Sequence, residues 1–400
     1  MLNFIIGIVP FLIIISLIVT FHELGHYWLA RLFGTRIERF SVGFGKILLR
    51  RKDKRGTEWC ISALPLGGYV KFAGDENVTS MMPSIAELEA SRESITRKEG
   101  ADAVKEYFHF KPLWQRFLIV LAGPVANFVL AILVFALLFA TFGDRTTPAT
   151  IAKLEPGGAA EAAGFLVGDT ILSIDGKKVH DFADMAVLVS LRPDTPTRFV
   201  VDRQGSRVDL VATPRRVPMD DKGPNPNLTK GQLGVETERR DVFVRYNPIE
   251  ALIKGNDETW KALDTNLTYV GRIFSGKENG NQIGGIVGMT KATGDITAAA
   301  TQVQAPWWFT ALSLLYTYLT LMAYISIAVG FLNLLPIPML DGGHLAFYAW
   351  QGVTRKPVSP EIQNAAFRIA VVLVLGLMTF ALWNDLNNTG FVKFLGGLFS

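Results

Sequence analysis

Four long apolar segments restrict what this sequence of 400 residues can fold into. A helix needs about 20 mainly apolar residues to cross a bilayer, and a soluble domain rarely contains several such runs. The segments are Phe4 to Leu32, Phe117 to Gly143, a stretch within Ile296 to Leu340, and Ile369 to Asn384. Because 49% of all residues are hydrophobic, we expect an α-helical polytopic membrane protein with about four transmembrane helices.

The fourth segment is the weakest, since only 16 uncharged residues separate Arg368 from Asp385. To span the membrane it must include residues before Arg368, with that side chain extending to the interface; otherwise it lies shallow in the membrane.

The first segment lacks a basic start and a small-residue cleavage site, so we expect it to be retained. One cysteine, Cys60, excludes an internal disulfide. The net charge of +4 forms no basic patch with interleaved aromatics, so we expect no nucleic-acid partner.

The sequence His22-Glu23-Leu24-Gly25-His26 lies at the end of the first apolar run. On a helix, histidines at i and i+4 share one face and can bind one metal ion, while the glutamate can take a proton from water. Only five histidines occur in the chain, which makes a chance match rare. The spacing predicts a zinc-protease site at a membrane edge, with two interfacial histidines at a helix end as the alternative.

Asp341 is the candidate for the third zinc ligand. It follows the third apolar run, and an ionisable group at membrane depth is a functional candidate because burying it unpaired is costly. An aspartate that caps a helix is the simpler interpretation. His344 is a rival ligand, since it would share a helical face with Asp341.

The loop charges predict the orientation. Lys and Arg crowd residues 34–112, so this region is expected in the cytoplasm and the amino terminus outside. Alternating crossings then place residues 143–306 outside the cytoplasm. Helices one and three bring His22, His26 and Asp341 to the same depth, toward the cytoplasmic side. A bacterial inner membrane is the expected location.

Three motifs together resemble the site-2 protease family of intramembrane metalloproteases. They are the motif at His22, the sequence Leu-Ala-Gly-Pro-Val-Ala-Asn-Phe at residues 121–128, and Asn-Leu-Leu-Pro-Ile-Pro-Met-Leu-Asp-Gly-Gly at residues 333–343. The resemblance covers nearly the whole chain. It implies one zinc ion held by His22, His26 and Asp341, Glu23 as general acid/base, and Asn333 as a residue that holds the substrate backbone.

The implied substrates are single-pass membrane proteins that have already been trimmed outside the membrane, such as an anti-sigma factor, and remnant signal peptides. Two other classes remain open: an idle membrane scaffold, and a transporter that uses the same polar residues for metal or proton passage. The intact Glu23 disfavours both.

Residues 155–176 resemble part of a protease-type PDZ domain, expected between about residues 148 and 214. Such a domain could capture peptide ends by strand addition or only exclude bulky ectodomains. Some bacterial members of the family carry two tandem PDZ domains, whereas this sequence shows one.

Residues 37–49 and 57–72 alternate apolar and polar side chains around a charged turn, which predicts a hairpin. The resemblance implies a membrane-associated sheet there. Its strand with Gly67, Gly68 and Tyr69 could pair with an unwound substrate, although a cytoplasmic surface hairpin is a competing interpretation. Residues 247–274 have the rhythm of an amphipathic helix, against either the membrane or the PDZ domain.

These expectations define eight regions. They are helix 1 (1–33), the hairpin and a charged helical loop (34–112), helix 2 (113–143), the PDZ domain (144–215), the region after it (216–305), helix 3 (306–345), helix 4 (360–388) and an extracytoplasmic tail (389–400).

Overall fold

The computed structural model describes residues 2–74, 85–219, 229–237, 242–277, 285–302 and 305–388. The expected tail at 389–400 lies outside these residues. The chain forms two compact units. One comprises residues 1–136, 254–263 and 289–380, and the other comprises residues 137–253, 264–288 and 381–400.

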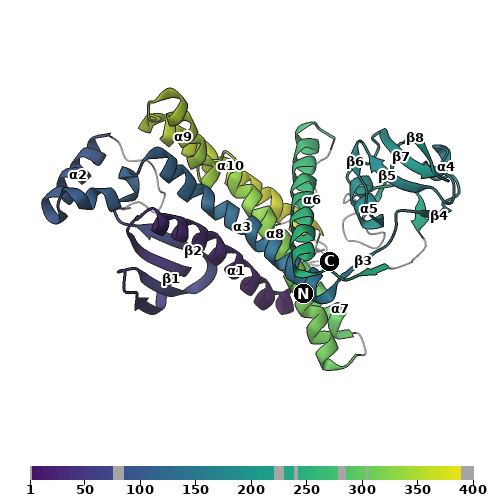
Figure 1. Cartoon of the computed structure of the whole chain (residues 1–400), viewed down its shortest axis with the longest axis horizontal. Helices are drawn as coiled ribbons and strands as arrows, with labels where there is room; N and C mark the ends of the chain where they lie inside the picture. Colours follow the sequence, from purple (N-terminus) through teal and green to yellow (C-terminus); the bar gives the residue numbers. More distant parts are fainter. Residues whose placement is uncertain are drawn as a thin grey trace, which may run out of the picture. The chain divides into compact units, whose positions relative to one another are not determined.

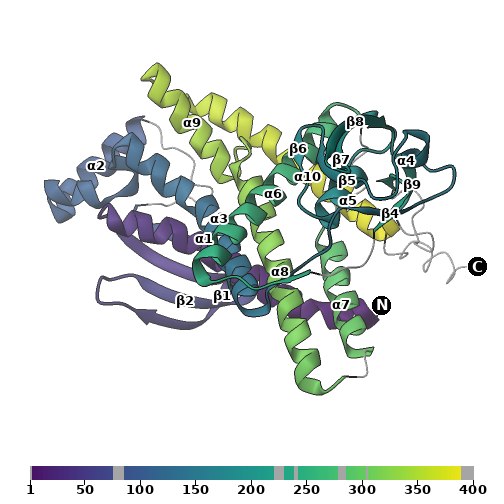
Figure 2. The same ribbon diagram turned by 45° about the vertical axis from the view of Figure 1, so that its right-hand side comes forward.

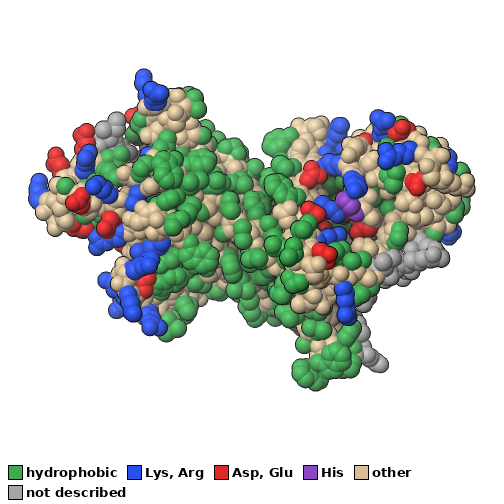
Figure 3. Space-filling view, in the orientation of Figure 1, with side chains coloured by type: hydrophobic (Ala, Val, Ile, Leu, Met, Phe, Trp, Pro, Cys, Tyr) green, Lys and Arg blue, Asp and Glu red, His purple; other side chains and the backbone are tan. Residues whose placement is uncertain are grey.

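Among the described residues, four helices are long and apolar enough to span a membrane (Figure 1). They are α1 (Leu2–Leu32), α3 (Leu113–Phe142), α8 (Trp307–Leu334) and α10 (Pro360–Asn388). A helix satisfies its own backbone hydrogen bonds, which lipid cannot do. Figure 3 shows hydrophobic side chains over these helices in the first unit and charged ones over α2 (Ile85–Glu99). The predicted fold class is confirmed: the chain is mostly helical, with several small antiparallel sheets.

The third predicted helix, 306–345, is divided in two. Helix α8 ends at Leu334, and α9 (Asp341–Thr354) begins after a turn. Pro336 and Pro338 lie between them, and proline cannot donate the backbone hydrogen bond that would continue a helix. Asp341 therefore starts a new helix.

The predicted hairpin is present as β1 (Ile37–Lys52) and β2 (Glu58–Phe72), and both strands bend. Residues 39–42 pair with residues 58–61 and also with residues 68–71, while residues 47–52 pair with residues 58–62. The backbone φ angles of +87° at Gly43 and +119° at Gly67 allow these bends. The two strands therefore form four segments, with 68–72 at one edge. This sheet lies alongside α1 in both views (Figures 1 and 2).

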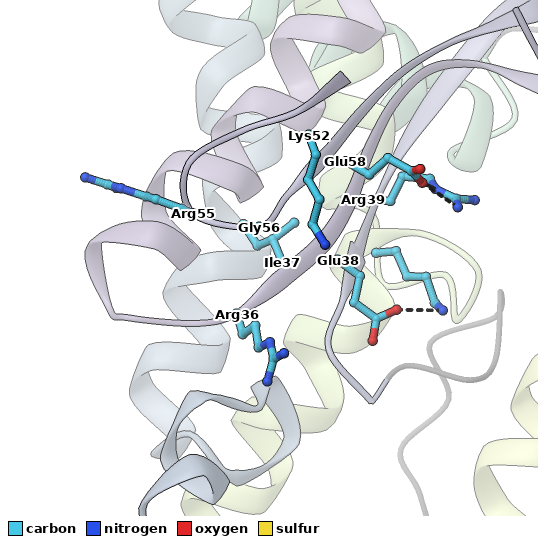
Figure 4. Close-up of a pocket in the computed structure, with 9 residues that line it drawn as sticks. Arg36, Ile37, Glu38, Arg39, Lys52, Arg55, Gly56 and Glu58 are labelled. Carbon is cyan, nitrogen blue, oxygen red and sulfur yellow. Dashed lines mark hydrogen bonds and ion pairs between the residues drawn. The ribbon is translucent and has the colours of Figure 1, made fainter. Parts of the chain in front are cut away.

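A pocket of about 370 Å³ lies at the start of this sheet (Figure 4). Arg39 pairs with Glu58 at 2.6 Å, and Lys71 pairs with Glu38 at 2.8 Å. The lining residues are Arg36, Ile37, Glu38, Arg39, Lys52, Arg55, Gly56, Glu58 and Lys71. Since Arg36 also pairs with Glu99, three of the five cations are neutralised, and the pocket is mainly an ion-pair cluster. Helix α2 and two short 3-10 helices, η1 (Ala101–Glu106) and η2 (Phe108–Phe110), follow the sheet.

The second unit contains a module inserted between two paired strands, β3 (Asp144–Thr146) and β12 (Val242–Val244). Its main sheet has the order β6-β5-β7-β8 around a core that includes Phe165 and Phe199. The elements are β4 (Ile151–Leu154), α4 (Ala159–Ala162), β5 (Thr170–Ile174), β6 (Lys177–Lys178), α5 (Phe182–Ser190), β7 (Thr197–Arg203), β8 (Ser206–Ala212), β9 (Arg215–Pro218), β10 (Thr229–Gln232) and β11 (Val235–Thr237).

The module continues beyond residue 215, where the sequence suggested its end. Strand β11 pairs with β4, β10 pairs with β9, and Leu233 is buried in the same core as Phe199. The module therefore extends to Thr237. Helices α6 (Pro248–Phe274) and α7 (Ile286–Gln302) come after it. Helix α6 matches the predicted amphipathic helix, and Asn247 and Glu250 form a capping box at its start.

A buried ion pair makes the stability of the module dependent on pH. Hydrogen bonds from Arg203 to Asp169, at 2.7 and 2.8 Å, hold the pKa of the buried Asp169 carboxyl below its usual value. This stabilisation is present above the unfolded-state pKa of about 3.9 and is lost as the pH falls through the folded-state value. We expect Asp169→Asn to destabilise the module at pH 7 by about 2 kcal/mol. Hydrogen exchange of β7 in the intact protein measures this, and equal protection in both proteins at pH 7 would contradict it.

Candidate metal centre

Two histidines and an aspartate converge in the first unit. His22 and His26 lie one turn apart on α1, and their Nε2 atoms are 3.2 Å apart. Oδ2 of Asp341 lies 3.0 Å from Nε2 of His22 and 3.6 Å from Nε2 of His26. The structure thus brings together three residues that the sequence singled out.

The geometry of these three atoms fits a zinc ion. Tetrahedral zinc binds histidine nitrogen and carboxylate oxygen at about 2.0–2.2 Å, which places neighbouring ligand atoms about 3.3 Å apart. The three observed separations lie close to this value. Oδ2 of Asp341 is buried without an aligned hydrogen-bond donor among the described residues. A cation at the centre of the group would satisfy it.

Helix α3 contacts the outer nitrogen of each histidine. Nδ1 of His26 lies 2.8 Å from the backbone oxygen of Ile119, and Nδ1 of His22 lies 3.2 Å from Nδ2 of Asn127. Such partners orient metal-binding imidazoles. Neither role was predicted from the sequence. A polar Asn127 within an apolar run was the available signal, whereas a backbone oxygen has no sequence signature.

Close approach of α1 and α3 depends on two glycines. A Cβ atom at Gly25 would lie 2.2 Å from the backbone oxygen of Ala122, and one at Gly123 would lie 2.3 Å from Nε2 of His26 and 2.8 Å from Cε1 of His22. Small residues allow helix backbones in membranes to approach closely. Gly123 therefore leaves the space that both imidazoles occupy.

The turn between α8 and α9 fixes Asp341 as the first residue of α9. A Cβ atom at Gly342 would lie 2.2 Å from the oxygen of Leu335, and one at Gly343 would lie 2.4 Å from the oxygen of Ile337. The turn thus folds tightly onto the first residues of α9. This close packing holds the carboxylate in front of α1.

The bent sheet reaches the site beside Glu23. A Cβ atom at Gly68 would lie 3.5 Å from Cγ of Glu23 and 2.7 Å from the oxygen of Ser41. Ser16 of α1 donates a hydrogen bond of 2.6 Å to the oxygen of Pro65. Tyr69, the next residue in the same edge segment, stacks on Phe44 with ring centres 5.9 Å apart. The edge segment therefore lies next to the glutamate at Gly68, with Gly67 at the bend before it and Tyr69 after it.

Two other candidates from the sequence are not members of the ligand group. Asn333 is half-buried in the last turn of α8, where it makes no side-chain hydrogen bond to a described residue. His344 lies in the first turn of α9, but the ligand group found among the described residues contains only His22, His26 and Asp341. The rival assignment of His344 as the third ligand is therefore not favoured.

Two imidazoles and a carboxylate that could hold a metal ion lie with a neighbouring glutamate among membrane-spanning helices, an arrangement typical of a metal-dependent hydrolase within a membrane protein. The chain belongs to peptidase family M50, whose family model matches residues 10–377. It is accordingly an intramembrane zinc metalloprotease, and the resemblance inferred from the three motifs is confirmed.

The chain is similar to the metalloprotease MmpA of Caulobacter vibrioides, with 45% identity over 400 residues that cover 100% of both chains. A protein of Agrobacterium fabrum whose name describes a zinc metalloprotease is 38% identical over 384 residues, covering 95% of this chain and 96% of the relative. The regulator of sigma-E protease RseP of Escherichia coli is 28% identical over 487 aligned residues, covering 97% of this chain and 100% of RseP. The similarity to MmpA is thus the stronger of these.

Proposed function

We propose that His22, His26 and Asp341 hold one zinc ion and that Glu23 is the general acid/base for cleavage of peptide bonds within transmembrane segments. The convergence of the three ligand atoms beside Glu23, which lies within the membrane-spanning helix α1, is the observation that carries the proposal.

The chemistry follows from these side chains. Zinc, when bound, supplies Lewis-acid chemistry that polarises the scissile carbonyl and lowers the pKa of water. Glu23 takes the proton of the attacking water and then delivers it to the nitrogen of the leaving amine. Glu23 follows His22 directly on α1, and its Cγ would lie 3.5 Å from a Cβ atom at Gly68 of the bent sheet. Burial of the histidines limits access of bulk water, which strengthens each electrostatic interaction.

The edge segment of the bent sheet is proposed to receive the substrate. A transmembrane helix resists hydrolysis because its carbonyls are hydrogen-bonded, so a substrate must unwind and find replacement partners. An exposed strand edge can supply them by strand addition. Gly68 and Tyr69 belong to that edge segment, Gly67 is the bend that leads into it, and Gly68 lies beside Glu23, while Asn333 would hold the substrate backbone from α8.

The proposed substrates are single-pass membrane proteins that have been trimmed outside the membrane, including an anti-sigma factor and remnant signal peptides. The name of RseP, a regulator of sigma-E, supports the first class. The proposed location is a bacterial inner membrane, with the site toward the cytoplasm and the inserted module on the other side. The basic residues of the 34–112 region support this orientation.

Purified full-length protein in detergent tests the function directly. We expect it to cut a tagged, pre-trimmed single-pass substrate within its apolar segment, and we expect a zinc chelator to stop the reaction and added zinc to restore it. Mass spectrometry of the products locates the cut. Cleavage only outside the apolar segment, or cleavage that persists without zinc, would contradict the proposal.

We further propose that residues 144–237 form a PDZ domain that controls which substrates reach the site. A four-stranded sheet with two short helices supports this assignment. Strands β3 and β12 bring the two ends of the module together, with Thr146 opposite Val242. The module can therefore be removed without separating the chain ends that it connects.

Replacing residues 147–241 by Asn-Gly joins β3 and β12 through a two-residue turn, which suits a hairpin. If the module excludes bulky ectodomains, this variant will cut an untrimmed substrate about as fast as wild type cuts the trimmed one. If it captures peptide ends, cleavage of the trimmed substrate will fall instead. Cleavage rates for both substrates, compared with wild type, decide between the roles; unchanged rates for both would refute control by the module.

A further inference from the structure

The side chain of Asn127 has no role in the mechanism described above, although it is fully buried against a proposed zinc ligand. Its Nδ2 atom lies 3.2 Å from Nδ1 of His22. Its Oδ1 atom is buried and has no hydrogen-bond partner among the described residues. Among the described residues, no other side-chain hydrogen bond therefore holds the carboxamide in one orientation.

The two histidines differ in what their outer nitrogens contact. The oxygen of Ile119 can only accept, so Nδ1 of His26 donates to it, and Nε2 of the neutral ring keeps its lone pair. His22 faces a carboxamide, which can either donate or accept. The chemistry of His22 thus depends on which amide atom faces its ring.

The two amide orientations have opposite consequences. When Nδ2 faces the ring, it donates to Nδ1, and the proton of neutral His22 must reside on Nε2. A half-turn of the amide places Oδ1 in nearly the same position, where it accepts Nδ1–H and leaves the Nε2 lone pair directed at Asp341 and His26. Only the second orientation makes Nε2 a metal ligand.

The fold holds the backbone of Asn127 in place. Ser326 of α8 donates a hydrogen bond of 2.8 Å to the backbone oxygen of Asn127. A Cβ atom at Gly330 would lie 3.1 Å from Cβ of Asn127, so α8 and α3 are in close contact there. Ile119, Gly123 and Asn127 are spaced at i, i+4 and i+8 along α3, which places them in one row that faces α1.

We propose that Asn127 is a positioning residue that accepts Nδ1–H of His22 through Oδ1 and so directs the Nε2 lone pair at zinc. This inference rests on the proposed function, since it requires His22 to be a zinc ligand. It assigns α3 one acceptor for each histidine, a backbone oxygen for His26 and the Asn127 amide for His22.

Zinc affinity of the full-length protein in detergent, measured by competition with a chromogenic chelator, tests the proposal. Asn127→Leu keeps the size of the side chain but removes the acceptor, and we expect affinity to fall about 10- to 100-fold. Asn127→Asp can only accept when ionised, and we expect its affinity to stay within about threefold of wild type. Thr259→Ala is the matched control: it removes a buried side-chain hydrogen bond of 2.8 Å to the oxygen of Gly255 within α6, which does not touch Asn127 or the histidines, so affinity should not change.

A second measurement needs no substitution at Asn127. In zinc-loaded protein with His109, His180 and His344 replaced by Gln, only His22 and His26 contribute histidine ¹⁵N signals. We expect Nδ1 of both to be protonated. Wild-type affinity in Asn127→Leu, or an unprotonated Nδ1 on His22, would overturn the inference. Failure of wild type to bind zinc would instead overturn the proposed zinc site itself, so the two failures are distinguishable.

Discussion

Replacement of Glu23 by glutamine should abolish proteolysis while leaving zinc bound. The amide has nearly the same shape as the carboxylate but cannot take a proton from water, and loss of a general base typically costs about 10²- to 10⁴-fold in rate. We expect single-turnover cleavage of a trimmed substrate to slow by about a thousandfold. Zinc content should remain at one ion per chain, because Glu23 is not among the three converging ligand residues.

Glu89→Gln is the control for this measurement, because Glu89 is an exposed residue of α2 and its replacement removes the same charge elsewhere. Its cleavage rate should equal that of wild type. Loss of zinc from Glu23→Gln would place Glu23 in the ligand group, and an unchanged rate would exclude it as the general base.

Gly123→Ala should remove zinc binding, although Gly123 contributes no ligand atom. The added Cβ would lie 2.3 Å from Nε2 of His26 and 2.8 Å from Cε1 of His22. Neither ring can turn away without breaking its contact with Ile119 or Asn127. Because the displaced imidazoles can no longer both reach one zinc ion, we expect zinc affinity to fall at least about 100-fold and the cleavage rate to fall with it.

The matched control is Gly376→Ala in α10, where an added Cβ would meet no atom of the described residues within 4 Å. It makes the same substitution in another membrane-spanning helix and should retain zinc and activity. If Gly123→Ala bound zinc as tightly as wild type, α1 and α3 would not pack as closely as described.

Much of the site could be predicted because its geometry is local. The i, i+4 spacing of His22 and His26 is a property of any helix, and the apolar run before it fixes the helix in a membrane. Asp341 lies more than 300 residues away, but matching its depth to that of the histidines was enough to select it.

The parts that could not be predicted depend on contacts distant in sequence. The oxygen of Ile119 becomes a histidine partner only through the packing of α3 on α1. The alternating pattern predicted two strands, but the double pairing of residues 39–42 arises from bends at Gly43 and Gly67. Likewise, β11 joins the inserted module through pairing with β4, which no local pattern after residue 215 indicated.

The row formed by Ile119, Gly123 and Asn127 couples two equilibria: the packing of α3 against α1 and the proposed binding of zinc. Rotation of α3 by one residue would turn the row by about 100° and remove both acceptors and the free space together. An ion that binds only the packed form must stabilise that form, by an amount that grows with the logarithm of its concentration above its dissociation constant. The resistance of α1 and α3 to separation should therefore rise with the supply of zinc in the cell.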